Sequence, residues 1–207
     1  MNTTESKHQS KTKLLDAALY VIRSKGYSAT RVEDVCEAAG LTKGSFFHHF
    51  KGKEDLAIEA ARYWGEVTSA LFAQAPYHAP ADPVERVLAY IDFRKALLQG
   101  ELAEYTCLLG TMLQETYDTH PAIRVACEKS LSDHAATIEL DIADALQSRG
   151  LNVSWTASSL AYYTQATIQG AFILAKAKNN SEVAVECLDH LRRYLELIFV
   201  PSTSKEN

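Results

Sequence analysis

The amino-acid sequence predicts an all-α fold. Apolar residues recur at helical spacings along most of the 207-residue chain. No segment alternates convincingly between apolar and polar residues, which is the pattern of a half-buried strand. Residues that cap helices, among them Thr30, Thr42 and Asp82, stand directly before several of the apolar stretches. We therefore expect helices throughout the chain and no strands.

The first predicted helix covers Lys11 to Lys25, and Gly26 ends it. Its apolar residues fall on one stripe and should pack against the helices that follow. These residues are Leu14, Leu15, Ala18, Leu19 and Ile22. The segment before it, Met1 to Gln9, is polar and has no apolar core of a signal peptide, so we expect a short disordered arm.

Two short helices joined by a tight turn are predicted next. Thr30 is a candidate N-cap, and Glu33, three places on, completes a capping box. Gly40 can take the left-handed conformation that ends a helix. Thr42 then caps a second helix from Lys43 to about His49. A helix, a turn containing Gly and a second helix form the unit that places its second helix in the major groove of DNA.

The run Thr42–Phe50, followed by Lys53–Leu56, resembles the recognition-helix segment of the tetracycline-repressor (TetR/AcrR) family. Ala17-Ala18, Gly26-Tyr27 and Thr30–Gly40 fit the same pattern, so the resemblance covers roughly the first 56 residues. It implies a three-helix DNA-binding domain, a larger C-terminal helical domain for effector binding and dimerisation, and a role in transcriptional regulation. Phe47 departs from the pattern, because family members usually carry a Tyr there that bonds a DNA phosphate.

The resemblance and the helix position divide the candidate DNA-binding residues by role. Residues at the start of the second helix can reach base edges, as Lys can with guanine. We place Thr42, Lys43, Ser45, Phe46 and His48 in this group. Lys53, His49 and the backbone near Thr30 are expected at phosphates, and Phe47 is left to packing and van der Waals contact. Phe50 is expected in the core.

In the remaining chain we expect six further helices and one loop. The loop runs from Ala75 to Asp82 and contains Pro76 and Pro80. Asp82 followed by Pro83 is a favourable helix start, because proline has no N–H to leave unpaired at the first position. The helices are expected at Lys53–Phe72, Pro83–Leu98, Ala103–Tyr117, Pro121 to a stop at Gly150, Ser154–Lys178 and Ser181–Ile198, with a frayed tail at Ser202–Asn207. We expect a DNA-binding domain at 1–52 and an effector-binding and dimerisation domain at 53–207.

Charge and cysteine content narrow the function classes. The net charge is −5, but residues 1–55 carry +2 and the rest −7, so the basic surplus lies at the DNA-binding end. The four cysteines lack zinc-finger spacing, so we expect no structural metal and no cofactor. The sequence contains no run of about 18 or more apolar residues, so we expect no membrane-spanning helix. Reduced thiols and a cytoplasmic location are therefore expected.

A second candidate site follows from Thr106–Met112. Its Cys-Leu-Leu-Gly stretch resembles the start of a helix that lines the effector cavity in one branch of the family, and Lys176 resembles a Lys that thiol-sensing members keep near that Cys. A nearby cation would favour the reactive thiolate, whereas burial would leave Cys107 inert. The candidate effector residues are Tyr105, Cys107, Leu108, Met112, Gln114, Tyr117, Tyr163, Gln165, Gln169, Phe172 and Lys176.

These observations predict a one-component regulator, most simply a repressor that leaves a palindromic operator in double-stranded DNA when a small organic or electrophilic effector binds. Residues 156–177 and 182–199 are apolar on more than one side and should form a four-helix seam in a homodimer. Their apolar residues, of which one face would serve the domain core and another the seam, are Leu160, Tyr163, Thr167, Ala171, Leu174, Val185, Leu188, Leu191, Leu195 and Ile198. No catalytic residues are expected. The alternatives are a helical enzyme that uses Cys107 and a DNA-binding protein without an effector.

Overall fold

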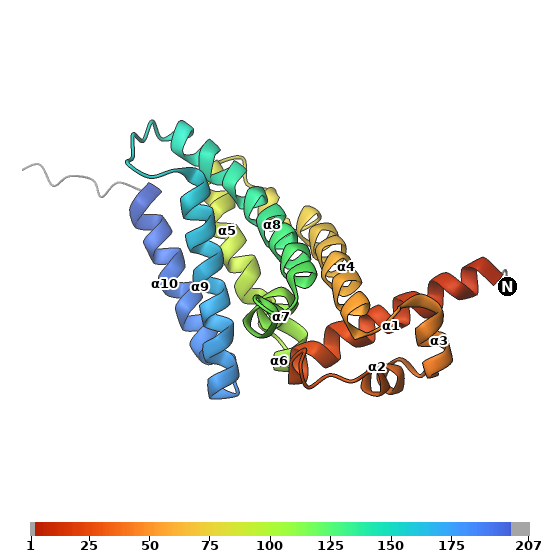
Figure 1. The fold of residues 1–207 in the computed structure, drawn as a ribbon. Coiled ribbons are helices and arrows are strands. Elements are labelled where there is room, and N and C mark those ends of the chain that lie inside the picture. Colours follow the sequence, from red (N-terminus) through yellow and green to blue (C-terminus); the bar gives the residue numbers. More distant parts are fainter. Residues whose placement is uncertain (1–2, 200–207) are drawn as a thin grey trace, which may run out of the picture. The chain divides into compact units, whose positions relative to one another are not determined.

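The structure is a computed structural model that describes residues 3–199, with side chains from residue 7 onward. In this range it consists of helices without any strand, which confirms the all-α prediction (Figure 1). The α-helices are α1 (Thr3–Lys25), α2 (Val32–Ala39), α3 (Lys43–His49), α4 (Lys53–Ala73), α5 (Pro83–Ala96), α6 (Leu102–Tyr105), α7 (Leu108–Thr116), α8 (Pro121–Ser148), α9 (Ala157–Lys178) and α10 (Glu182–Phe199), and one 3₁₀ turn, η1, covers Pro76–His78.

The chain forms two compact units. Of the described residues, 3–69 and 106–131 make up unit 1, and 70–105 and 132–199 make up unit 2. Unit 1 therefore joins the N-terminal helices to α7 and the first part of α8. These bounds differ from the division at residue 52, which stays a prediction about function.

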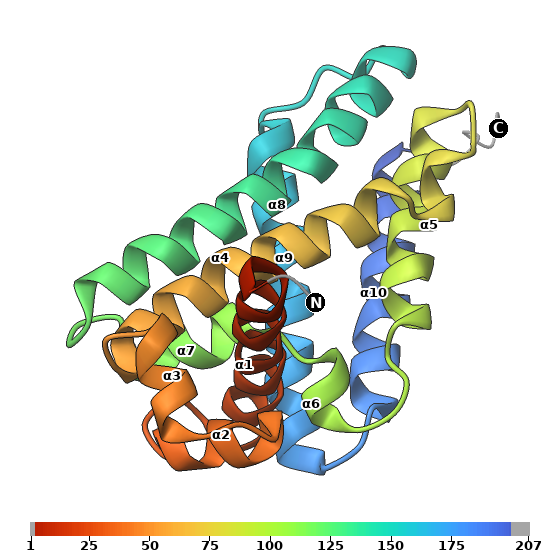
Figure 2. The ribbon, with the colours of Figure 1, turned by 90° about the vertical axis from the view of Figure 1, so that its right-hand side faces the viewer.

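Unit 1 is held together by the apolar stripe of α1. Leu14, Ala18 and Ile22 are fully buried, as are Val35 of α2 and Phe46 of α3. Figure 2 shows α1 beside α2 and α3, consistent with their packing (Figure 2). Burial of side chains of this size contributes roughly 1.5–3 kcal/mol each, so this small core fixes the orientation of α3.

Several predicted caps are confirmed. The Thr42 hydroxyl accepts the amide of Ser45 at 3.2 Å, and the Asp82 carboxylate accepts the amide of Val84 at 3.0 Å. Gly40 ends α2 with φ 63°, and the Leu41 amide donates to the carbonyl of Cys36. This left-handed geometry costs a residue with a Cβ more than it costs glycine, so Gly40 sets the turn between α2 and α3.

The prediction that Thr30 caps α2 is wrong by one residue. The Thr30 hydroxyl donates to the carbonyl of Gly26 at 2.6 Å, and its side chain is buried. Arg31 takes the N-cap position, where its amide donates to the Asp34 carboxylate at 2.7 Å. Asp34, rather than Glu33, therefore supplies the carboxylate of the capping box.

The first helix is longer than predicted, because α1 already begins at Thr3 and most of the expected arm is helical. The Ser10 and Thr12 hydroxyls donate to the carbonyls of Lys7 and His8, so these side chains find hydrogen-bond acceptors within their own helix. Met1 and the tail Ser202–Asn207 lie outside the described residues.

The helix predicted at Ala103–Tyr117 is interrupted. Thr106 and Cys107 separate α6 from α7, and Cys107 has an extended backbone with φ −78° and ψ 125°. The Thr106 carbonyl accepts from the Arg23 guanidinium at 3.5 Å. The start of α9 also differs, because Thr156 and Ser159 form a capping box two residues beyond Ser154.

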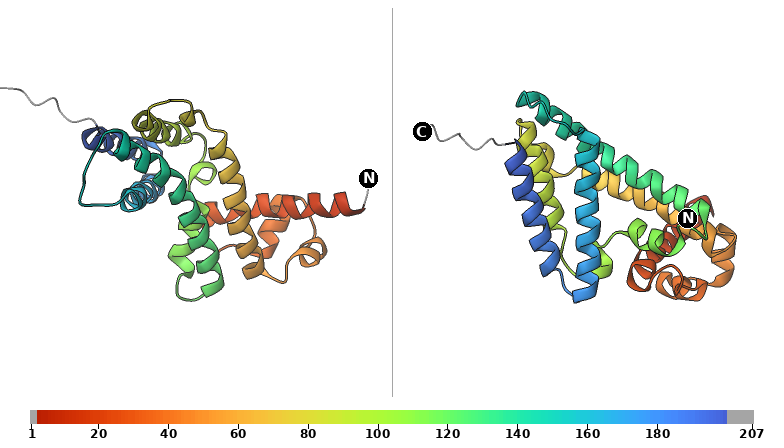
Figure 3. Two further views of the ribbon diagram at one scale, coloured as in Figure 1. Left: turned by 90° about the horizontal axis from the view of Figure 1, so that it is seen from above. Right: turned by 60° about the vertical axis from the view of Figure 1, so that its left-hand side comes forward.

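Unit 2 contains α5, α9 and α10, and Figure 3 shows α10 beside both other helices (Figure 3). Five of the apolar residues predicted on these two helices form the face that serves the core of the unit. They are Leu160, Ala171, Leu188, Leu191 and Leu195, each at most 5% exposed. Among residues 3–199, none of the helices combines the length and apolar character that crossing a bilayer requires.

Candidate functional site

The exposed face of α3 is the first candidate site. Its residues Thr42, Lys43, Gly44, Phe47 and His48 are exposed, whereas Ser45 is half-buried. Phe47 is 58% exposed, which is unusual for so large an apolar side chain. The spacing of Lys43 and Phe47, and of Gly44 and His48, places both pairs on one side of the helix. This face presents a cation, hydroxyl and imidazole groups, and an apolar ring.

The expectation that Phe46 reaches base edges is wrong. Its ring is fully buried and packs against Phe50, with ring centroids 5.4 Å apart. Phe50 is 1% exposed, which confirms its predicted place in the core. One turn of α3 thus points Phe46 and Phe50 inward and leaves Phe47 outside. Phe46 acts on the exposed face only by holding the helix in place.

Lys43 already has an anionic partner. Its ammonium group pairs with the Glu33 carboxylate of α2, and both side chains are about half exposed. The hydrogen bond to Lys43 is the largest cause that lowers the pKa of Glu33. Any base or phosphate that binds Lys43 must therefore compete with a carboxylate that belongs to the protein.

Two residues predicted at phosphates, Lys53 and His49, have internal partners. Lys53 donates to the carbonyls of Tyr27 and Ser28 and lies 4.4 Å from the centre of the Tyr27 ring, so two of its three N–H donors are engaged. His49 contacts the Ser10 hydroxyl at 2.7 Å. Burial, followed by the charges of neighbouring groups, lowers the pKa of His49 and favours its neutral form.

The turn between α1 and α2 is bound by α7. The two oxygens of the Glu115 carboxylate accept the amides of Tyr27 at 3.1 Å and Ser28 at 2.7 Å. Gly26 adopts φ 88°, and a Cβ there would lie 2.3 Å from a Glu115 oxygen. The backbone conformation therefore favours glycine, and a larger residue would displace the Glu115 carboxylate. The His120 ring also contacts the Tyr27 ring edge-on.

The predicted effector residues divide between the two units. In unit 1, Cys107, Leu108 and Met112 are buried, whereas Gln114 and Tyr117 are exposed. Cys107 stands at the N-cap of α7 without a side-chain capping bond. Burial, with a smaller contribution from Cys107, raises the pKa of the Cys127 thiol to about 12.

In unit 2, Tyr105 and Phe172 have ring centroids 6.3 Å apart, and buried Gln165 donates to the Tyr90 hydroxyl at 2.8 Å. Gln169 and Lys176 are half-buried. Tyr163 lies elsewhere, because it is 48% exposed and contacts Tyr194 of α10. The structure thus brings together part of the predicted set, and Tyr163 belongs to the outer surface of α9 and α10.

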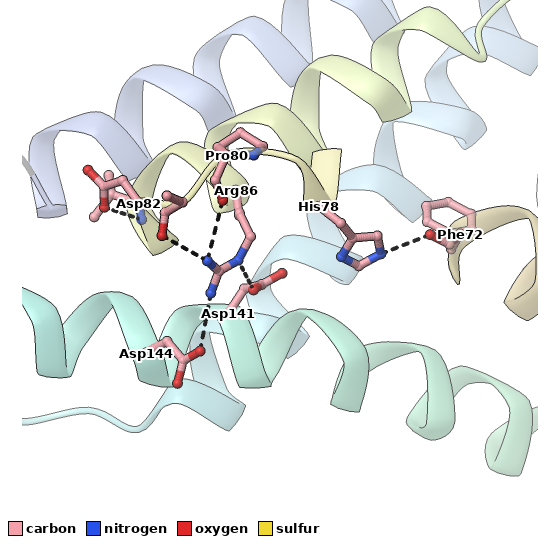
Figure 4. Close-up of polar contacts among 9 residues, drawn as sticks. Phe72, His78, Pro80, Asp82, Arg86, Asp141 and Asp144 are labelled. Atoms are coloured by element: carbon pink, nitrogen blue, oxygen red, sulfur yellow. Dashed lines mark hydrogen bonds and ion pairs between the residues drawn. The ribbon is translucent and has the colours of Figure 1, made fainter. Parts of the chain in front are cut away.

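An ion-pair network fixes the first turn of α5. Arg86 donates to Asp141 at 2.6 Å and Asp144 at 3.2 Å, both on α8, and also to the carbonyl of Ala81 (Figure 4). Arg149 pairs with the capping residue Asp82. Since paired carboxylates satisfy these cations, the network has a structural role within unit 2.

The outer surface of α9 and α10 carries exposed apolar side chains. Tyr163 and Leu174 on α9 and Tyr194 and Leu197 on α10 are each more than 40% exposed. Nothing lies within 4 Å of a Cβ built on Gly170 of α9, so the backbone itself is accessible there. Exposed apolar groups beside accessible helix backbone are features that favour close packing of another helix.

Comparisons with known proteins decide the family. Residues 14–60 match the model of bacterial regulatory proteins of the tetR family. Residues 83–189, more than half of the chain, match the C-terminal domain of LmrA/YxaF-like transcriptional regulators. The chain belongs to the TetR family. It is a DNA-binding transcriptional regulator with an LmrA/YxaF-like C-terminal domain.

Two relatives of this TetR-family chain come from Bacillus subtilis (strain 168). The uncharacterized regulator YxaF is 30% identical over 60% of this chain and 65% of its own length. The regulator LmrA is 28% identical over 83% of this chain and 89% of its own. The FadR regulator of Bacillus subtilis, solved in complex with stearoyl-CoA, has the same fold, with a TM-score of 0.69, 18% identity and coverage of 91% and 97% of the two chains.

Sequence reasoning missed three residues of this TetR-family regulator. Arg31, the N-cap residue of α2, is strongly exposed. In sequence it is separated from α3 by the whole of α2. Tyr90 and Arg94 of α5 contact His134 of α8. Sequence alone shows an Arg and a Tyr four residues apart on one helix, but their partner lies 40 and 44 residues further on, and no spacing rule connects them.

Proposed function

We propose that this TetR-family protein is a homodimeric repressor that binds a palindromic operator through α3 and leaves it when a small organic effector binds in residues 53–207. The observation that carries the proposal is the division of α3 into two faces. Phe46 and Phe50 anchor the helix in the core, while Lys43, Phe47 and His48 remain exposed. TetR-family regulators are typically repressors with ligand-binding C-terminal domains.

The proposed contacts follow from the chemistry of each exposed group. Thr42, Lys43, Ser45 and His48 read base edges, and the Phe47 ring supplies apolar contact in place of a phenol. Arg31 and the third N–H of Lys53 bind phosphates, which set the register of α3 on the duplex. Thr30 supports the turn from within, and neutral His49 holds α3 to α1 through Ser10.

A dimer would form across the outer surface of α9 and α10. The exposed apolar side chains and accessible Gly170 support this face for the seam, since the buried apolar residues of α9 and α10 serve the core. A two-fold arrangement sets two recognition helices about 34–36 Å apart, which matches successive major grooves and requires a palindromic site.

Release by an effector is a linkage effect. A ligand that binds better to the conformation with misplaced recognition helices lowers DNA affinity by the ratio of its two affinities. The FadR structure contains stearoyl-CoA, which supports a ligand-binding role for this fold. Release could also follow a covalent reaction, and Cys107 is the candidate thiol that an electrophile would modify.

The test begins with selection of binding sites from random duplex DNA by the full-length protein, followed by footprinting. We expect two symmetry-related half-sites, and Lys43→Ala should weaken the selected site by roughly 1–3 kcal/mol more than random DNA. Absence of sequence preference would remove the repressor proposal. A selected operator whose affinity responds to no small molecule would instead favour a DNA-binding protein without an effector.

A further inference from the structure

Arg94 differs from the other cations near it. On α5, Arg86 pairs with Asp141 and Lys95 with Asp189, and Arg192 of α10 pairs with Asp92. Arg94 is half-buried and has no carboxylate partner among the described residues. Its guanidinium lies over two aromatic rings, 5.3 Å from the centre of Phe72 and 5.7 Å from that of Phe172.

The hydrogen bond from Arg94 to His134 is weak. Its Nη1 lies 3.4 Å from Nε2 of His134, and the Tyr90 hydroxyl lies closer to the same nitrogen, at 3.0 Å. Gln165 donates to the Tyr90 oxygen, so the hydroxyl proton of Tyr90 is free to be donated to His134. One imidazole lone pair then serves two donors, and Tyr90 holds the better position.

Near neutral pH, His134 carries no proton charge that would alter these hydrogen bonds. Burial and, secondarily, the charge of Arg94 lower the pKa of His134 to about 3, so the imidazole is neutral. The cluster of Tyr90, Arg94, His134 and Gln165 therefore carries one positive charge, that of Arg94. Aromatic rings attract a guanidinium but offer no oxygen to its N–H groups.

The unbonded nitrogens of Arg94 face accessible space. A guanidinium has five N–H donors, and Arg94 uses some of them at His134, at 3.4 Å, and at the Tyr90 hydroxyl. Within the described part of the chain, every buried side-chain nitrogen or oxygen has a partner. The nitrogens of Arg94 that lack a partner must therefore reach surface that a water molecule, or a ligand atom, can touch.

We propose that Arg94 anchors the acid group of the effector, and that the effector is an organic carboxylate with an apolar body. The planar guanidinium can bind a carboxylate through two parallel N–H bonds, which neutralises the unpaired charge. Phe172 and Tyr105 lie beside this position and would pack against the apolar body. The Tyr90–His134–Gln165 network positions Arg94. The assignment rests on the proposed function insofar as it makes this ligand the effector.

Calorimetric titration of the full-length protein without DNA tests the site directly. The probes are cinnamate and octanoate, the neutral cinnamyl alcohol, and inorganic phosphate. We expect both carboxylates to bind, with affinity at least about tenfold lower in Arg94→Gln, because a charged bidentate contact is lost. The alcohol should bind weakly and equally to both proteins. Arg94→Lys keeps the charge without the planar fork and should fall between them.

Arg124→Gln is the matched control, because it removes an exposed guanidinium of α8. It should bind the carboxylates like the native protein. Thermal unfolding by circular dichroism checks that each variant is folded. The proposal is overturned if neither carboxylate binds the native protein at millimolar concentration, if Arg94→Gln binds them unchanged, or if phosphate binds as tightly as the carboxylates.

Operator binding, measured separately, distinguishes this inference from the proposed function. Carboxylates that bind through Arg94 without changing operator affinity would support the site and contradict effector release. A neutral compound that releases DNA equally from the native protein and Arg94→Gln would support effector release and contradict the role of Arg94.

Discussion

Glu115 accepts the backbone amide of Ser28 at 2.7 Å, so α7 holds the turn that leads into the DNA-binding helices. The second oxygen of the same carboxylate accepts the amide of Tyr27. Both bonds lie within unit 1, and they span almost 90 residues of sequence. A displacement of α7 would therefore be transmitted to the start of α2.

Replacement of Glu115 by Ala should loosen this turn. Hydrogen exchange at the Tyr27 and Ser28 amides should become faster, because both lose their acceptor, and unfolding free energy should fall by roughly 1–3 kcal/mol. Glu66→Ala, which removes an exposed carboxylate of α4, is the control and should change neither amide. Unchanged exchange in Glu115→Ala would contradict the role of Glu115.

Replacement of Glu33 by Gln should increase operator affinity. Lys43 no longer has to leave a carboxylate partner, and a negative charge near the DNA is removed. Glu37→Gln removes an exposed charge from the same helix, so it controls for charge alone. Fluorescence anisotropy at several salt concentrations measures both. Equal gains in the two variants would show that the pairing with Lys43 is unimportant.

Gly170→Glu should separate the dimer without unfolding the subunit. The added side chain meets nothing within 4 Å in the monomer, and Glu is a better helix former than Gly by several tenths of a kcal/mol. In a seam, however, it would place a charge against apolar partner residues. Analytical ultracentrifugation should show monomers, while Leu140→Gln on α8 should remain dimeric. A Gly170→Glu dimer of native affinity would exclude this surface.

The His134 network predicts a loss of stability in mild acid. The pKa of His134 is about 3 in the folded protein and near 6.5 when unfolded, so the unfolded state binds more protons between these values. Stability from this residue is present above pH 6.5 and decreases as pH falls, by about 2 kcal/mol at pH 5. Urea unfolding should show a flatter pH dependence in His134→Gln, and no flattening in the exposed control His8→Gln.

Cys107 and Cys127 should differ in reactivity although both are buried. Burial raises the pKa of Cys127 to about 12, so almost no thiolate forms there at neutral pH. Labelling with iodoacetamide and mass spectrometry should show that Cys107 is modified before Cys127. If it does, Cys107→Ser should keep operator binding and lose any response to electrophiles. Equal labelling of both thiols would end the case for a thiol switch.

Local sequence signals predicted much of this fold because caps and apolar periodicity act over a few residues. Thr42 and Asp82 occupy the positions their side-chain chemistry favours. Thr30 does not, since the Gly26 carbonyl and Asp34 offer better partners than the expected box. The burial of Phe46 beside exposed Phe47 depends on the direction of α1, and two adjacent Phe residues give no sign of which is inside.

Contacts between distant segments could not be predicted. Arg94 and His134 lie 40 residues apart, and neither belongs to a motif. The interruption at Thr106 is accompanied by a contact with Arg23 from a different helix, and helical periodicity across Ala103–Tyr117 gives no sign of it. Such features follow from tertiary packing, which overrides local preference.

The Lys43–Glu33 pair also bears on how the protein would find its site among many others. On arbitrary DNA, Lys43 exchanges one anion for another of similar charge and gains little, so a brief encounter is not prolonged by this residue. A guanine edge offers two acceptors in a fixed direction and can compete with a mobile carboxylate. If Lys43 reads bases as proposed, this internal counter-ion would shorten the time spent at wrong sequences and leave more of the protein free to search.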